Sequence, residues 1–444
     1  MRKLTLLFLI SLSACENSEL RTEATTSATA KKEIFKTGEV IDSVRCAGDA
    51  SKSFSLFLPA DYDTAKKYPL LIFYDPHGAG SLPLKKYHHL AEEFNVVMMG
   101  SNDSKNGMAP EATNQIASLL MQEASQHLSV TANISLAGFS GGAKVAMHAA
   151  ANSAVISAVI YSGSVAEISS PTFFLFGIAG VNDMNYSDLI SFDESLGDNP
   201  NRLLIEWIGK HEWPDSISFR DAFYLVRFLG MKNGDLPKDE SLIKKFIAEK
   251  NAALKIAQAN LTTQKKLNEE VIIFLSGIAE VSDQKLALQK LSANPQLIAA
   301  ETAKKNSLAE ESKAKQELSA ALERKDLSWW KNEIELLSSG SAPMEKRLLG
   351  FISLACYSYT NAAIQQKNLF AAEKLLKIYR LADLLNADQA FFESCFFAMK
   401  GENELSVQSL QRAMTLGFSN KQKIKNEPAL APILNDERVQ QLIH

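Results

Sequence analysis

The stretch Asn133-Ile134-Ser135-Leu136-Ala137-Gly138-Phe139-Ser140-Gly141-Gly142 decides the fold, because an apolar run leads directly into a G-x-S-x-G turn. Residues 133–136 predict a short strand, and the good helix formers in 143–150 predict a helix immediately after the turn. A serine on so sharp a turn has a strained backbone, and glycines beside it avoid collisions with the neighbouring strand and helix. The pattern therefore predicts that Ser140 stands exposed at the carboxyl end of a strand.

Two further polar residues follow predicted strands downstream. The apolar run 171–177 precedes a loop that carries Asp183, and the run 203–208 ends shortly before His211. Carboxyl ends of parallel strands meet at one edge of a sheet, so Ser140, Asp183 and His211 are expected to lie together. A hydroxyl, a carboxylate and an imidazole are the groups that a nucleophile, an orienting acid and a general base require.

Other residues compete for two of these roles. The alternatives to Asp183 as the acid are Asp188, Asp193 and Glu167. Apart from His148 and His444, His211 is the only histidine between Ser140 and the C-terminus. His148 lies on the predicted helix and is expected to point away from the serine, which leaves His211 as the base.

A third predicted strand, 69–74, runs into Asp75-Pro76-His77-Gly78-Ala79-Gly80. The last four residues resemble the H-G-x-G motif of esterases and lipases. That resemblance implies that backbone N–H groups near Gly78 and Ala79 join the N–H of Gly141 in an oxyanion hole. The loop 102–106 leaves a strand at the same edge and is a candidate substrate contact. Phe139 and Trp213 are either an apolar wall beside the serine or packing residues.

Together these motifs resemble the α/β-hydrolase superfamily over roughly residues 36–230, and the strands around 54–59 look like those of compact feruloyl esterases, polyhydroxybutyrate depolymerases and dienelactone hydrolases. The alternation of strands and helices predicts a doubly wound, mostly parallel sheet. The resemblance implies a serine esterase. Many hydrolases insert a lid where this chain has only the short loop 162–170, so we expect an open cleft that suits a bulky or polymeric ester. No sequence motif indicates a cofactor or a metal. A peptidase or amidase with the same triad, and a tethered scaffold that binds a protein partner, are the alternatives.

Composition narrows the function classes. The chain has 444 residues and a formal net charge of −4, so it lacks the excess of basic residues that is typical of proteins that bind nucleic acid. Residues 1–15 contain a positive start, an apolar run and Leu12-Ser13-Ala14-Cys15, which resembles the lipobox of bacterial lipoproteins. That resemblance implies lipidation of Cys15 and an anchor in a membrane of the bacterial cell envelope. An ordinary cleaved signal is the alternative, and the polar segment 16–35 is expected to be a flexible tether.

The C-terminal half loses strand character after the predicted hydrolase domain, 36–235. Residues 240–267 and 296–322 predict long charged helices within a helical segment, 236–340. In 341–444 a 34-residue offset matches Ala372 with Ser406 and Leu376 with Leu410, which resembles tetratricopeptide repeats followed by a cap. The resemblance implies a surface for a protein partner or a cap beside the site. Cys356 and Cys395 could pair or remain buried thiols.

Overall fold

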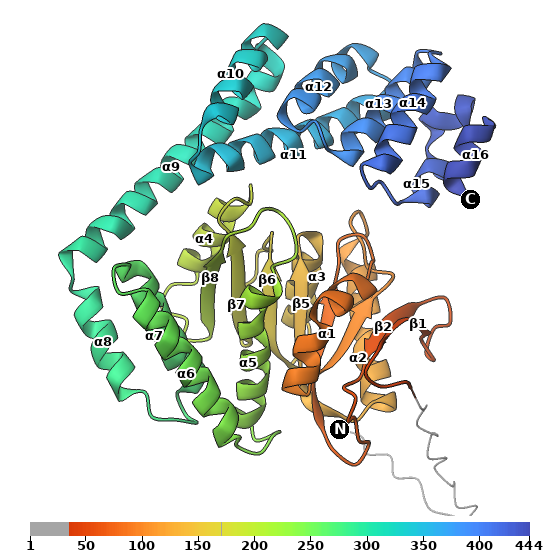
Figure 1. Ribbon diagram of the computed structural model, residues 1–444. Helices are drawn as coiled ribbons and strands as arrows, with labels where there is room; N and C mark the ends of the chain where they lie inside the picture. Colours follow the sequence, from red (N-terminus) through yellow and green to blue (C-terminus); the bar gives the residue numbers. More distant parts are fainter. Residues whose placement is uncertain (1–34, 170) are drawn as a thin grey trace, which may run out of the picture. The chain divides into compact units, whose positions relative to one another are not determined.

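The computed structural model describes residues 35–169 and 171–444, and its centre is a sheet in the order β1-β2-β4-β3-β5-β6-β7-β8 (Figure 1). The strands are β1 (Val40–Arg45), β2 (Ser53–Phe57), β3 (Tyr68–Tyr74), β4 (Val97–Ser101), β5 (Val130–Phe139), β6 (Ile156–Ser162), β7 (Phe174–Gly180) and β8 (Arg202–Trp207). Strand β2 pairs antiparallel with β1 and β4, and every other neighbouring pair is parallel. This confirms the predicted mostly parallel sheet.

Helices cover both faces of the sheet (Figure 1). One face packs on α1 (Ser81–Phe94), α5 (Ser216–Lys232), α6 (Glu240–Ile256) and α7 (Leu261–Leu275), and the other on α2 (Pro110–His127), α3 (Gly141–Ala151) and α4 (Tyr186–Ser195). The sequence of strand β3 is continuously apolar because both of its faces are buried. Leu71 and Phe73 enter the first core, whereas Leu70 and Ile72 enter the second, because side chains alternate along a strand.

The predicted single helix over 240–267 is wrong, because the chain breaks between α6 and α7. The side chain of Asn260 accepts a hydrogen bond from the Thr263 N–H, which caps the start of α7. Both helices pack on the sheet layer. The Phe246 ring lies 5.3 Å from the Phe228 ring of α5 and 5.5 Å from the Phe274 ring of α7. These phenylalanines belong to the same core as the side chains of β3 and β7 that point to this face of the sheet.

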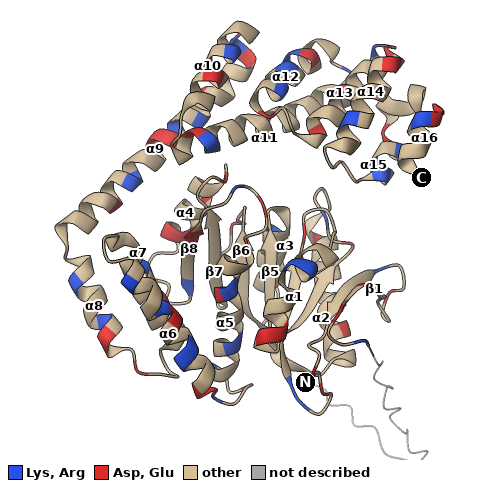
Figure 2. Ribbon diagram, viewed as in Figure 1, with Lys and Arg blue, Asp and Glu red and all other residues tan. Residues whose placement is uncertain are grey.

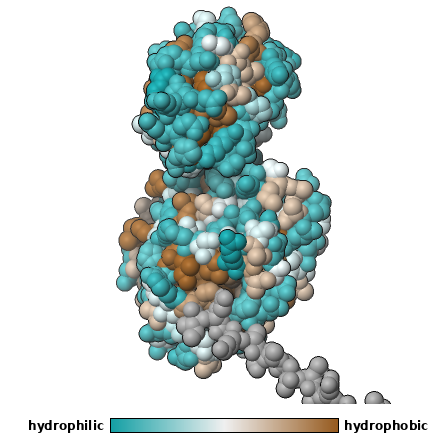
Figure 3. Space-filling model, turned by 90° about the vertical axis from the view of Figure 1, so that its right-hand side faces the viewer, coloured by the Kyte–Doolittle hydropathy of each residue, from teal (hydrophilic) through white to brown (hydrophobic). Residues whose placement is uncertain are grey.

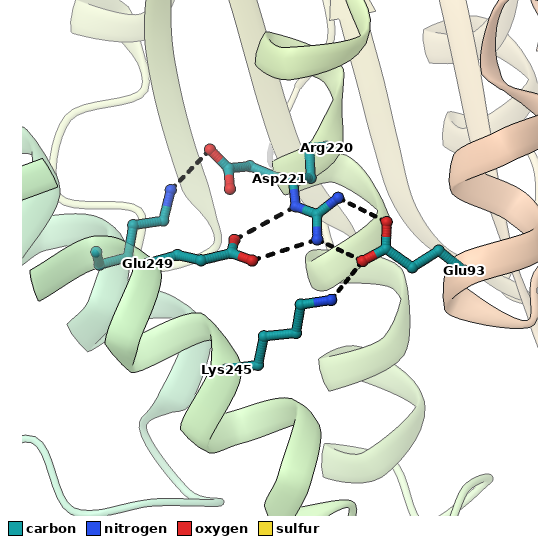
Figure 4. A network of polar contacts seen from close by, with 6 residues as sticks. Glu93, Arg220, Asp221, Lys245 and Glu249 are labelled. Carbon is teal, nitrogen blue, oxygen red and sulfur yellow. Dashed lines mark hydrogen bonds and ion pairs between the residues drawn. The ribbon is translucent and has the colours of Figure 1, made fainter. Parts of the chain in front are cut away.

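A network of charges also ties α6 to the sheet layer (Figure 4). Arg220 of α5 donates to Glu93 of α1 at 2.7 Å and to Glu249 of α6 at 3.3 Å. Lys245 of α6 reaches the same Glu93 carboxylate at 2.5 Å. The predicted domain boundary at residue 235 therefore falls directly before two helices that cover the sheet, and the division into folding units stays a prediction.

The rest of the chain is helical, as the sequence predicts. The helices are α8 (Ser282–Ser292), α9 (Pro295–Arg324), α10 (Leu327–Ser339), α11 (Pro343–Gln365), α12 (Leu369–Ala382), α13 (Ala387–Met399), α14 (Asn403–Thr415), α15 (Lys421–Asn426) and α16 (Glu437–Ile443), with a 3₁₀ turn at Pro428–Ile433. Helices α9 to α16 share a third core, from Leu318 to Ile443, to which α8 does not contribute. Ala372 and Ser406 are fully buried between paired helices, and the tetratricopeptide resemblance stays a prediction.

The surface carries charges of both signs, including those along α8 and α9 (Figure 2). On the face drawn in Figure 3, hydrophilic residues predominate on the helical region, and hydrophobic residues gather in a patch on the sheet-containing part. Cys46, Cys356 and Cys395 are buried free thiols. Within the described ranges, no helix is long and apolar enough to cross a membrane. The predicted signal peptide, Cys15 and all of the predicted tether up to residue 34 lie outside the described residues.

Candidate active site

Ser140 lies on the turn between β5 and α3 with φ +52° and ψ −124°, a conformation that residues with side chains rarely adopt. The residues two positions before and two positions after it must be glycines. A Cβ on Gly138 would lie 2.2 Å from the Gly142 oxygen, and one on Gly142 would lie 1.8 Å from the Tyr74 oxygen. The Ser140 N–H donates to the Ser162 oxygen at 2.8 Å, which fixes the turn against the end of β6. The predicted strand, sharp turn and helix are therefore present.

The structure brings Ser140, His211 and Asp183 into one hydrogen-bonded chain. Ser140 Oγ lies 3.0 Å from His211 Nε2. On the other side of the ring, His211 Nδ1 lies 2.9 Å from Asp183 Oδ1 and 3.0 Å from Oδ2. The Asp183 side chain is 3% exposed and that of His211 is 23% exposed, so the carboxylate is shielded and the imidazole is accessible. In this arrangement a proton on Nδ1 leaves Nε2 free to accept the hydroxyl hydrogen.

The alternative acids lie elsewhere, and among the described residues none of them hydrogen-bonds His211. Asp193 pairs with Arg202 at 2.5 Å, at the opposite end of β8 from His211. Glu167 is exposed in the loop after β6. Asp188 lies in the first turn of α4 with an exposed side chain, and partial desolvation by the surrounding protein raises the pKa of its carboxyl.

Local hydrogen bonds orient the Asp183 carboxylate. The Asn185 N–H donates to Asp183 Oδ1 at 2.8 Å, and the Asp183 N–H donates to the Gly180 oxygen at 2.9 Å. The Asn185 side chain then donates to the Gly163 oxygen at 2.7 Å, which links this loop to the end of β6. The carboxylate is thus held by its own turn as well as by the imidazole.

Phe139 and Trp213 turn out to be packing residues, the second of the two predicted alternatives. They are only 7% and 5% exposed. The Phe139 ring lies 4.8 Å from the His211 ring and 5.7 Å from the Trp213 ring. A Cβ on Gly163 would come within 2.5 Å of the Phe139 ring and 3.1 Å of the imidazole. Phe139 therefore supports one side of the imidazole, and Gly163 leaves room for both rings.

Gly78 and Ala79, the two predicted oxyanion-hole residues in the loop after β3, differ in whether their N–H groups are already hydrogen-bonded. The Gly78 N–H donates to the Asp75 oxygen at 3.1 Å, in a turn where Gly78 has φ +71°. The Ala79 N–H makes none of the hydrogen bonds found within the described chain. Gly141 is the first residue of α3, and the first four N–H groups of a helix have no acceptor within it. Ala79 and Gly141 are therefore better placed to donate than Gly78.

Asp75 connects the two sides of the site, a role that sequence reasoning missed. Its Oδ2 accepts from Trp213 Nε1 at 2.9 Å, and its Oδ1 accepts from the His77 N–H at 2.9 Å. Burial raises the pKa of Asp75, but the hydrogen bonds from His77 and Trp213 outweigh it and hold that pKa below its usual value. The signal was an acidic residue at the end of an apolar strand, directly before Pro-His-Gly.

The loop 102–106, predicted as a candidate substrate contact, lies against the serine turn. A Cβ on Gly141 would come 1.7 Å from Asn106 Oδ1, so the amide of Asn106 occupies the space that a side chain at 141 would need. The Asn106 N–H donates to the Pro76 oxygen at 2.8 Å. The backbones of Lys105 and His77 form an isolated antiparallel β-bridge. The contact with substrate stays a prediction.

The part of the chain that the structure describes contains no group of three or more His, Cys, Asp or Glu side chains that could hold a metal ion. His88 and His89 lie side by side on α1, with ring centroids 5.8 Å apart.

No family model and no curated protein matches the chain. Similar solved structures include Est1E from Butyrivibrio proteoclasticus, with 14% identity over 44% of this chain and 100% of that one, at a TM-score of 0.36. A feruloyl esterase module from Clostridium thermocellum has 13% identity over 44% and 87% of the two chains, at 0.35. A dienelactone hydrolase from Anabaena variabilis has 15% identity over 44% and 97%, at 0.32. At these values no activity follows from the likeness. The fold itself is a mostly parallel, α/β-hydrolase-like sheet followed by an all-helical region.

Proposed function

We propose that the protein is a serine hydrolase of carboxylic esters, with Ser140 as nucleophile, His211 as general base and Asp183 as the residue that orients the imidazole. The observation that carries this proposal is the hydrogen-bonded chain from Ser140 Oγ through His211 to the buried Asp183 carboxylate, at 3.0 Å and 2.9 Å. The strained backbone of Ser140, on a turn that requires glycine at positions 138 and 142, supports the same role, because strain of this kind is concentrated at functional sites.

The reaction has two steps. His211 Nε2 takes the proton of Ser140 as Oγ attacks the ester carbonyl, and the alcohol leaves with that proton when the tetrahedral intermediate collapses. Water then attacks the acyl-enzyme, again giving its proton to Nε2, and the carboxylic acid leaves as the Ser140 hydroxyl is restored. Asp183 stabilises the charged imidazole in both steps without taking a proton itself.

The negative oxygen of each intermediate needs donors beside Ser140. We infer that the N–H groups of Ala79 and Gly141 supply them, because neither is used by the hydrogen bonds described above. Gly78, whose N–H is paired with Asp75, instead allows the turn that presents Ala79. Loss of one such donor costs about 100- to 1000-fold in rate.

Labelling with a fluorophosphonate tests the nucleophile. Wild-type protein is expected to label and to hydrolyse p-nitrophenyl acetate, whereas Ser140→Ala loses both. Ser164→Ala, a serine in the loop after β6, is the matched control and keeps both. Hydrolysis by Ser140→Ala at the wild-type rate would refute the proposal. A preference for peptide anilides over esters would favour the amidase alternative, and an unreactive wild type that binds a partner protein would favour the scaffold.

We further propose that Cys15 is lipidated and anchors the enzyme in the bacterial cell envelope, with residues 16–35 as a tether. The support is the lipobox-like sequence alone. Metabolic labelling with a fatty acid is expected in the wild type and absent in Cys15→Ser, which should leave the membrane fraction. A mature N-terminus at any position other than 15 would contradict the anchor.

A further inference from the structure

Two positively charged side chains, one from α9 and one from α11, bind the loop that carries Asp183. This acid loop consists of residues 181–187, from the end of β7 into the first turn of α4. Arg347 of α11 donates from Nη1 to the Val181 oxygen at 2.7 Å. Lys315 of α9 donates from Nζ to the Met184 oxygen at 2.6 Å and to Ser187 Oγ at 2.7 Å. The carbonyl groups on both sides of Asp183 are therefore held by side chains that lie more than 120 residues further along the chain.

A buried carboxylate fixes the two cations. The Glu311 side chain is 0% exposed. Its Oε2 accepts a hydrogen bond from Arg347 Nε at 2.9 Å, and its Oε1 forms an ion pair with Lys315 Nζ at 3.0 Å without a hydrogen bond. The Arg347 guanidinium also stacks over the Tyr186 ring, with its carbon 4.7 Å from the ring centroid. Because a buried carboxylate that loses its cations is strongly destabilising, Glu311 favours the positions in which Arg347 and Lys315 stay beside it and reach the acid loop.

The sheet holds the opposite side of the same loop. The Val181 N–H donates to the Trp207 oxygen at 3.0 Å, and the Asn182 N–H donates to the Gly209 oxygen at 2.9 Å. Backbone N–H groups of the loop are thus bound by the end of β8, near His211, and its carbonyl groups by α9 and α11. Both sets of hydrogen bonds act on the loop that places the Asp183 carboxylate beside His211 Nδ1.

We propose that α9 and α11 clamp the acid loop, with Arg347, Lys315 and Glu311 as positioning residues for Asp183, a role that rests on the proposed hydrolase function. The helical region is then part of the catalytic apparatus and not only a docking surface. Displacement of a catalytic group by about 1 Å can cost about 100-fold in rate, so loss of the clamp slows the chemical step even though none of the three residues touches the substrate.

A purely structural role makes a different prediction. In that case, removal of the clamp lowers the melting temperature but leaves each folded molecule as fast as the wild type. The two roles are separated by the catalytic rate per active site, where the number of active sites is measured by titration with a fluorophosphonate. A positioning role lowers kcat per titrated site and leaves KM for a small ester nearly unchanged, because the binding surface is not altered.

The test uses the full-length protein and three variants. Lys315→Met removes the donor to Met184. The double variant Arg347→Met/Glu311→Gln removes the donor to Val181 together with the buried negative charge, so no unpaired carboxylate remains in the interior. Lys374→Met is the matched control, because Lys374 Nζ donates to a main-chain oxygen, that of Leu322, at 2.8 Å within the helical region itself.

For Lys315→Met and the double variant, kcat per titrated site on p-nitrophenyl acetate is expected to fall about 10- to 100-fold, with KM within about twofold of wild type. Amide hydrogen exchange in residues 182–187 is expected to speed up about tenfold or more, and Lys374→Met should change neither quantity. Unchanged exchange in the acid loop, or kcat per site within about twofold of wild type in both variants, would overturn the clamp. A wild type that neither labels nor hydrolyses esters would instead refute the proposed function, and the exchange measurement would still decide whether the clamp exists.

Discussion

Replacing Asp183 by asparagine tests the assignment of the acid without changing the shape of the site. Asp183 Oδ1 accepts from the Asn185 N–H at 2.8 Å, so the new amide keeps its oxygen there. Its NH₂ group then takes the Oδ2 position, 3.0 Å from His211 Nδ1, where it can only donate. The retained oxygen still lies 2.9 Å from the same Nδ1, but a hydrogen on Nδ1 would also face the NH₂ hydrogens at 3.0 Å and would no longer meet a negative charge. We therefore expect the imidazole to accept from the NH₂ group on Nδ1, which places its proton on Nε2, or to move away from the amide.

Either outcome removes the base that Ser140 needs. When Nε2 carries the proton, it can only donate to Oγ across the 3.0 Å contact and cannot accept the hydroxyl hydrogen. A wrong tautomer of this kind costs about 10⁴-fold in kcat, which is about 5.4 kcal/mol at about 1.36 kcal/mol per factor of ten. Stability should change little, because aspartate and asparagine have nearly the same volume and the hydrogen bond from Asn185 survives.

The assay is kcat/KM on p-nitrophenyl acetate, together with the rate of fluorophosphonate labelling and the melting temperature. Asp188→Asn and Glu167→Gln are the matched controls, since both were alternative acids by sequence and neither hydrogen-bonds His211. They should stay within about threefold of wild type, as surface substitutions usually have small effects. The assignment is refuted if Asp183→Asn keeps more than a tenth of the wild-type activity, or if either control loses more.

Three further substitutions or truncations test the surrounding structure. Gly141→Ala should lower kcat by about 100-fold, because the new Cβ would lie 1.7 Å from Asn106 Oδ1 and displace the donor beside Ser140; equal rates would contradict the predicted oxyanion hole. A truncated protein of residues 36–238 should be less soluble than the full-length protein, because it exposes the phenylalanines that α6 and α7 cover. A soluble, active product would instead support the boundary at 235. Arg220 donates to Glu93 and lowers the pKa of that carboxyl to about 2. Glu93→Gln should therefore cost about 1 kcal/mol of unfolding free energy at pH 7, allowing for solvent screening, and the difference should vanish as the pH falls from about 4.5 to 2; a difference that does not depend on pH would contradict this.

The sequence by itself determined the elements that depend on local pattern. The glycines around Ser140, the apolar runs of the central strands and the order of Ser140, Asp183 and His211 each follow from short-range rules of backbone geometry and side-chain periodicity. These rules were enough to predict a mostly parallel sheet and three side chains at the same edge of it. They also predicted the helical character of the second half, since the periodic apolar positions there are local as well.

Only the tertiary structure decided the contacts between distant segments. No spacing in the chain indicates that Asp75 bonds Trp213, that Asn106 lies over Gly141, or that Arg347 and Lys315 hold the carbonyl groups on both sides of Asp183. Nor does any spacing indicate that the Gly78 N–H donates to the Asp75 oxygen, the contact on which our proposal of Ala79 as an oxyanion donor depends. The physical reason is that such contacts depend on how whole helices and strands pack, so their partners can stand anywhere in the chain, whereas a turn or a strand is specified by the few residues that form it.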